Sequence, residues 1–213
     1  DSSVVQDKLS SGVRKIYSTK GSFAALKDDG SVVVWGDSLE YGAGVTSDQI
    51  NSGVEDIFSN GTSYAALKID GSVITFGGSH YNPYSGGYSN SHVNYYGADS
   101  SAVHSKLSSG VRKVFSTKGS FAALKNDGSV VAWGDAIENY DADIISNKLK
   151  SDVKDIFSHS NGNAFAALKN DGSVVTFGGS GYSPFNGNFA GSISFGKSFG
   201  ADSSAVQEKL SSG

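Results

Sequence analysis

The fold is decided by the stretch at residues 22–36, which reads SFAALKDDGSVVVWG. An Asp-Gly pair between two apolar runs is a strong hairpin signal, because Gly accepts the positive φ that the turn needs. In SFAALK, both alternating faces are apolar, and this pattern is typical of a strand buried on both faces. We therefore expect two antiparallel strands that lie packed between neighbouring sheets.

The same motif recurs along the chain. Ala-Ala-Leu-Lys-x-Asp-Gly-Ser-Val occurs four times, and a further strand is expected just before each copy, as in GVRKIYST from Gly12. The spacings of 41, 57 and 44 residues give a unit of about 50 residues, a period typical of propeller blades or solenoids. The sequence predicts an all-β fold of four propeller-like tandem repeats. The leucines of the four copies are Leu26, Leu67, Leu124 and Leu168.

A longer repeat groups these units in pairs. The opening segment DSSVVQDKLSSG returns with small changes at Asp99 and Asp202. We expect a first long repeat at residues 1–98, a second at 99–201, and the start of a further repeat at 202–213. The opening segment predicts a short helical turn, with Ser3 and Gln6 as a capping box and Gly12 as its end. A window from a longer array would have to close tightly, expose sheet edges or pair with another chain.

Composition excludes several classes of function. The chain has no Cys, which excludes disulfides, thiolate metal sites and thiol nucleophiles. Its net charge of −4 gives no electrostatic reason to expect a nucleic-acid partner. Because no apolar run approaches the roughly 18 residues of a membrane span, we expect none in this segment.

The repeat motif, extended to F-A-A-L-K-x-D-G-S-V-V-x-[WF]-G, resembles the blades of the regulator of chromosome condensation (RCC1) family. It is still more similar to the AALKxDGSVVTWG arrays of large bacterial surface or secreted proteins. The resemblance implies a β-propeller-like fold with about four strands per blade. Ser22-Phe23 replaces the family's usual His, and the family's Gly-Gln-Leu-Gly tail after Trp-Gly is absent. The exchange-factor and chromatin roles of the family are therefore not expected here.

Two sequence strings that match enzyme motifs lack the surrounding secondary structure that those motifs need. The string G-x-x-x-x-G-K-[ST] at residues 191–198 lacks the long helix that a phosphate loop needs, and the G-x-S-x-G string at 196–200 lacks an α/β context. We expect no catalytic, cofactor-binding or metal-ligating residues, and no enzyme. Calcium is an open alternative, because Asp37, Asp135 and the Asp-Gly turns offer carboxylate oxygens. The histidines have no metal-site spacing and are His80, His92, His104 and His159.

Two aromatic insertions follow the second and fourth units, at residues 79–98 and 180–201. They hold ten of the 24 aromatic residues, set among Gly, Ser and Asn. Aromatic side chains on small-residue loops give a large contact area at low entropic cost, which predicts a surface for a partner or for self-contact. The alternative is that they pack as extra strands against a neighbouring unit. The ten are Tyr81, Tyr84, Tyr88, Tyr95, Tyr96, Tyr182, Phe185, Phe189, Phe195 and Phe199.

Charge also alternates between units. Arg14-Lys15 and Arg112-Lys113 lie in odd units, whereas Glu55-Asp56 and Lys154-Asp155 lie at the matching places of even units. Opposite charges on adjoining units can help to set register. The alternative is that these side chains are solvated, since exposed pairs contribute under about 1 kcal/mol each.

These observations predict a non-enzymatic structural or adhesive repeat module of a large extracellular or cell-surface protein. Its expected partners are itself or neighbouring repeats, in an array or fibre, or a glycan or another surface protein. One alternative is a carbohydrate-binding propeller that uses the Tyr-rich insertion. Another is a protein-binding scaffold of the RCC1 kind.

Overall fold

Each repeat folds into one three-stranded antiparallel sheet in the computed structural model. The structure describes residues 3–36, 47–77, 99–134, 137, 145, 147–159, 162 and 164–178. Within these ranges, each sheet is one unit, and the units are numbered first to fourth in chain order. The strands are β1 (Val13–Ser18), β2 (Ser22–Lys27) and β3 (Val32–Gly36); β4 (Val54–Ser59), β5 (Ser63–Lys68) and β6 (Val73–Gly77); β7 (Val111–Ser116), β8 (Ser120–Lys125) and β9 (Val130–Gly134); β10 (Val153–Ser158), β11 (Ala164–Lys169) and β12 (Val174–Gly178).

The second and third strands of each unit form the predicted hairpin. At its turn Gly30 has a φ of +77°, and the Asp29 carboxylate accepts hydrogen bonds from the Ser31 N–H and hydroxyl at 2.9 and 2.6 Å. The same two bonds recur in the other three units. Across the hairpin, Phe23 pairs with Trp35 and their rings stack with centroids 5.4 Å apart. Equivalent stacked pairs occur in every unit, so the hairpin and its register are repeated four times.

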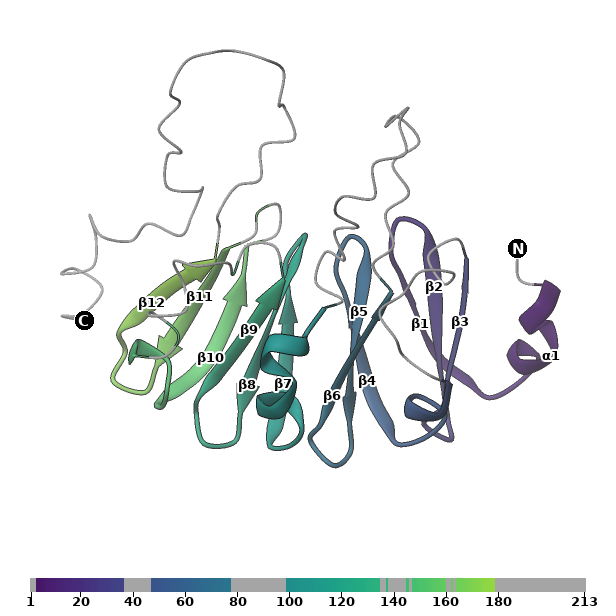
Figure 1. Ribbon diagram of the computed structural model, residues 1–213, viewed down its shortest axis with the longest axis horizontal. Coiled ribbons are helices and arrows are strands. Elements are labelled where there is room, and N and C mark those ends of the chain that lie inside the picture. The colour runs from purple at the N-terminus through teal and green to yellow at the C-terminus, as the bar shows by residue number, and fades with distance from the viewer. Residues whose placement is uncertain are drawn as a thin grey trace, which may run out of the picture.

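The four sheets lie side by side in chain order, with β1–β3 and β10–β12 at opposite ends of the longest axis (Figure 1). Each pair of neighbouring sheets encloses an apolar cluster. Between the first and second units, Ala24 and Leu26 of β2 pack with Ile57 of β4 and Tyr64 of β5. Corresponding clusters lie between the second and third units and between the third and fourth. The paired alanines of the first three units are fully buried, and their small side chains leave room for the sheets to approach.

Backbone hydrogen bonds join neighbouring units at both ends of the sheets. At the Asp-Gly turns, the Val54 N–H donates to the Gly30 carbonyl of the preceding unit at 3.0 Å. At the opposite ends, the Lys20 N–H donates to the Gly61 carbonyl at 3.1 Å, and the Gly61 N–H donates onward to Lys118. The bonds that correspond to Val54–Gly30 are Val111–Gly71 at 2.9 Å and Val153–Gly128 at 3.0 Å.

Short helices precede the first strands of three units. They are η1 (Ser3–Val5) with α1 (Gln6–Leu9), η3 (Ser47–Gln49) and η4 (Ser101–Leu107). The predicted helical turn is therefore confirmed, with Ser3 inside η1 and Gln6 as the first residue of α1, and its capping box stays a prediction. Leu107 of η4 is buried in the cluster between the second and third units, so packing holds this turn in place.

The predicted all-β fold of propeller-like tandem repeats is confirmed by the four stacked sheets. The resemblance implied about four strands per blade, whereas the described residues of each unit form three. The units lie in an open row (Figure 1). The division into 1–98, 99–201 and 202–213 stays a prediction.

Candidate interaction surfaces

The ten aromatic residues of the two insertions lie outside the described residues. Their role as a contact surface therefore stays a prediction. The phosphate-loop and G-x-S-x-G strings, Asp37, Asp135, His80 and His92 also lie outside them.

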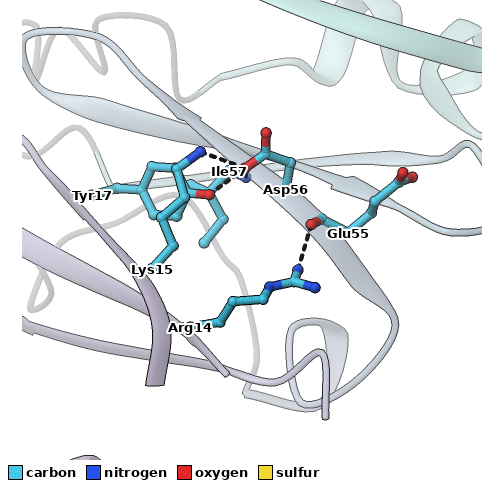
Figure 2. A network of polar contacts seen from close by, with 6 residues as sticks. All are labelled: Arg14, Lys15, Tyr17, Glu55, Asp56 and Ile57. Carbon is cyan, nitrogen blue, oxygen red and sulfur yellow. Dashed lines mark hydrogen bonds and ion pairs between the residues drawn. The ribbon is translucent and has the colours of Figure 1, made fainter. Parts of the chain in front are cut away.

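A polar network links the first strands of the first and second units (Figure 2). Arg14 of β1 donates to the Glu55 carbonyl at 2.7 Å. Lys15 forms an ion pair with the Asp56 carboxylate at 3.2 Å, and the Tyr17 hydroxyl donates a hydrogen bond to the same carboxylate. Of the two alternatives for these charges, pairing between adjoining units is the one found here, and it links β1 to β4.

This network shifts the pKa values of Lys15, Tyr17 and Asp56. Partial burial by itself would raise the pKa of Asp56, but hydrogen bonds from Tyr17, from the Ile57 N–H and from Lys15 hold it below its ordinary value. Burial, and then the bond to Asp56, raise the pKa of the Tyr17 hydroxyl. Hydrogen bonds to Tyr17 and Asp56 raise the pKa of Lys15. Each residue therefore keeps its ordinary charge at neutral pH, which suits a structural tie between units.

The third and fourth units repeat this arrangement with one change. Arg112 donates to the Lys154 carbonyl at 3.0 Å, and Lys113 pairs with Asp155 at 3.0 Å. Phe115 replaces Tyr17, so this copy has the ion pair without the hydroxyl. Among the described residues, no ion pair joins the second unit to the third. In the described residues, the ion pairs therefore join the first unit to the second and the third unit to the fourth.

The first unit has a partly uncovered apolar face, which we call the head face and define by Val13, Ile16, Phe23 and Trp35; Ala25 and Val33, at the centre of the same face, are buried. Ile16 is 58% exposed, whereas Val114 at the same position of the third unit is 2% exposed. Phe23 is 46% exposed, whereas Phe121 is fully buried. The second unit covers the third unit at these positions. Because no described sheet precedes β1–β3, the same side chains of the first unit face outward.

The fourth unit has an uncovered apolar face at the other end of the row. We call it the tail face and define it by Phe157, Ala166, Leu168 and Val174. Phe157 is 57% exposed, whereas its equivalents Phe58 and Phe115 pack against the clusters formed with the following units. The row therefore ends in two different apolar surfaces, one formed by each side of a blade.

Sequence reasoning did not single out these two faces. Phe23 and Phe121 lie in identical six-residue strands, so no local signal distinguishes the exposed ring from the buried one. The number of repeats was the available signal for uncovered faces. A row of four sheets has only three internal junctions, so the outer face of the first sheet and that of the last have no neighbouring sheet in the row. The expectation of exposed edges or pairing with another chain pointed to the ends without naming residues.

The structure also describes two of the histidines and the Asn-Gly-Thr sequence. His104 and His159 are exposed, and no group of three metal-binding side chains is found within the described ranges. Asn60 of the Asn-Gly-Thr sequence is buried, and its side-chain oxygen accepts the Ser63 N–H at 2.7 Å. In the same ranges, no helix is long and apolar enough to cross a membrane.

No family model and no curated protein matches the sequence. Solved structures similar in fold include human WBSCR16, with 19% identity and a TM-score of 0.45, covering 79% of this chain and 48% of that one. Another is yeast RCC1 (Prp20) bound to Kap60, with 15% identity, a TM-score of 0.44, and coverage of 78% and 42%. A third is the CRINKLY WD40 ectodomain of the Arabidopsis thaliana receptor kinase ACR4, with 14% identity, a TM-score of 0.43, and coverage of 78% and 55%.

The chain thus spans about half the length of these solved proteins. The likeness concerns the fold alone, and the propeller-type fold rests on the four stacked sheets themselves. The solved proteins include yeast RCC1, a member of the family whose repeats the sequence resembles. The narrower resemblance to bacterial surface arrays stays a prediction.

Proposed function

We propose that the protein is a non-enzymatic structural module that binds other protein chains through the ends of its row of blades, in an extracellular or cell-surface protein. The observation that carries this proposal is the pair of uncovered apolar faces. Ile16 and Phe23 are about half exposed at one end, and Phe157 is equally exposed at the other. Contiguous exposed apolar surface of this kind marks sites of protein contact.

The chemistry of the faces supports a protein partner. Each face is a sheet surface of aliphatic and aromatic side chains, and the internal copies of this surface are covered by another sheet. Aromatic anchors on such a surface contribute strongly when a partner excludes water from them. An apolar sheet surface offers few hydrogen-bonding groups for the hydroxyls of a sugar.

The extracellular setting is supported by the sequence. The chain has no Cys and no Met, is rich in Gly and acidic overall, and is built from near-identical repeats. These properties suit a long array outside the cell. An adhesive role follows if the end faces, or the aromatic insertions, meet a protein on another surface.

A bead-binding assay tests the proposal. Beads that carry the purified chain are mixed with beads of the same kind and, separately, with intact cells. The double variant Ile16→Asp/Phe157→Asp places a charge on both faces, and Ile69→Asp is the matched control, because Ile69 is 76% exposed in the β5–β6 turn. We expect wild type and the control to bind at least one surface, and the double variant to lose at least about tenfold in bound beads.

Protease treatment of the cells should abolish bead binding, and glycosidase treatment should leave it unchanged. Absence of binding on both surfaces, or binding that the double variant keeps, would overturn the proposal. Binding that only glycosidase removes would favour the carbohydrate-binding alternative instead.

A further inference from the structure

The junction between the second and third units shows what covers a head face. In this junction, β7–β9 presents Val111, Val114, Phe121 and Trp133 to the apolar side of β4–β6, where Leu67 is one of the residues that cover them. The first of these surfaces has the same composition as the head face, and the second has that of the tail face. The protein therefore contains, in its centre, a complete example of a tail face bound to a head face.

The correspondence extends through the whole cluster. Twelve residues form the apolar contact between the second and third units. At the ends of the row, eleven of the twelve equivalent residues are identical, and the twelfth is Ile16 in place of Val114. Isoleucine fits such a junction, because Ile57 and Ile156 at the same position are each 2% exposed. The equivalents are Val5, Leu9, Val13, Ile16, Phe23, Ala25, Val33 and Trp35 at one end and Phe157, Ala166, Leu168 and Val174 at the other.

The backbone at the two ends is also complementary. Inside the row, the first residue of each following sheet donates its N–H to the glycine carbonyl of the preceding Asp-Gly turn, as Val111 does to Gly71 at 2.9 Å. Val13 is the corresponding residue of the first unit, and Gly172 is the corresponding glycine of the fourth. Gly172 has a φ of +86°, close to the +77° of Gly71, so its turn has the internal geometry.

We propose that the tail face of one copy of this chain binds the head face of a second copy, in the register of the junction between the second and third units. This inference deepens the proposed function, on which it rests, by naming the partner and the register. Such a contact joins two different surfaces and is heterologous, so it either closes into a ring or continues as a filament. Two copies would bring eight sheets together, within the range of about four to eight blades at which propellers close.

Two complementary variants test the pairing. Ile16→Asp blocks the head face alone, and Phe157→Asp blocks the tail face alone. In sedimentation velocity, wild type and Ile69→Asp should form two-copy rings or longer species as concentration rises. Each blocked variant alone should stay a monomer near 22.0 kDa. An equimolar mixture of the two should form a 1:1 dimer and grow no further, because only one tail and one head are left to pair.

Circular dichroism of each variant confirms that the sheets are intact, since both replaced side chains are more than half exposed. The inference is overturned if wild type stays a monomer up to about millimolar concentration, if a blocked variant dimerises by itself, or if the mixture does not associate. If wild type stays a monomer but the beads still bind protein on cells through Ile16 or Phe157, self-pairing fails and the proposed function stands. If neither assay shows binding, both fail.

Discussion

Ile16 and Val114 occupy the same position in two copies of a repeat, yet 58% of the first side chain is exposed and 2% of the second. The neighbouring sheet accounts for this difference, because the second unit covers Val114 and no described sheet covers Ile16. The same relationship holds for Phe23 and Phe121. These matched positions allow the contribution of unit-to-unit packing to be measured within one chain.

Truncating the same side-chain position should lower the free energy of unfolding more at a junction between two units than at the end of the row. Val114→Ala removes buried methyl groups and leaves a cavity, so we expect the free energy of unfolding to fall by about 2 kcal/mol. Ile16→Ala, at an exposed site, should cost less than about 0.5 kcal/mol in the monomer. Urea unfolding at low protein concentration measures both. Equal losses at the two positions would contradict the open row.

Tyr17→Phe should convert the first polar network into the form found in the third unit. The change removes the hydroxyl that donates to Asp56, and we expect a loss of about 1 kcal/mol in the free energy of unfolding. The pKa of Asp56 should rise, because one of the groups that lower it is gone. Carboxyl-carbon NMR titration measures the pKa of Asp56 directly, and Asp155, which pairs with Lys113 beside Phe115, should not change. An unchanged pKa of Asp56 would contradict the role given to Tyr17.

Gly128→Ala should disrupt the junction between the third and fourth units. Gly128 has a φ of +78°, and an added Cβ would lie 2.9 Å from the Asp152 backbone nitrogen. Gly12→Ala is the matched control, since Gly12 has a φ of +70° but its Cβ would meet only the side chains of Lys27 and Asp28, at 3.5 and 3.9 Å, in ordinary van der Waals contact. Both variants have the cost of a left-handed alanine, about 1 to 2 kcal/mol. Thermal unfolding should show Gly128→Ala as clearly the less stable, and similar losses would argue against the close approach.

Acid should destabilise the Asp-Gly turns. Hydrogen bonds from the following serine hydroxyl and N–H lower the pKa of the turn aspartates below the ordinary value of 3.8. The folded state therefore binds protons less readily than the unfolded chain, and the stability that the turns contribute above this value is lost as pH falls through the lower folded-state pKa values. The four aspartates are Asp29, Asp70, Asp127 and Asp171.

Urea unfolding from about pH 6 to pH 2 should show this decline in the free energy of unfolding, and Asp127→Asn should make the decline shallower. A free energy of unfolding that rises over the same range would contradict the assignment.

The sequence was sufficient to predict the hairpins because their determinants are local. Asp29 and Gly30 set the turn, and the apolar run of SFAALK sets two buried faces, without reference to the rest of the chain. The charge alternation pointed to contacts between adjoining units without deciding between paired and solvated side chains, and Lys15 and Asp56 lie 3.2 Å apart. The helical turn was predicted from the same kind of local pattern, and its capping box of Ser3 and Gln6 stays a prediction.

By itself, the sequence determined the strands, their turns, the number of repeats and the way each sheet pairs its aromatic residues, since all of these depend on side chains a few positions apart. It could not determine which copy of a repeated residue is buried, because identical segments give identical predictions. Only the tertiary structure decided that Phe121 is buried and Phe23 is half exposed. Burial belongs to a pair of sheets, and within the described residues no further sheet lies against the outer face at either end of the row (Figure 1).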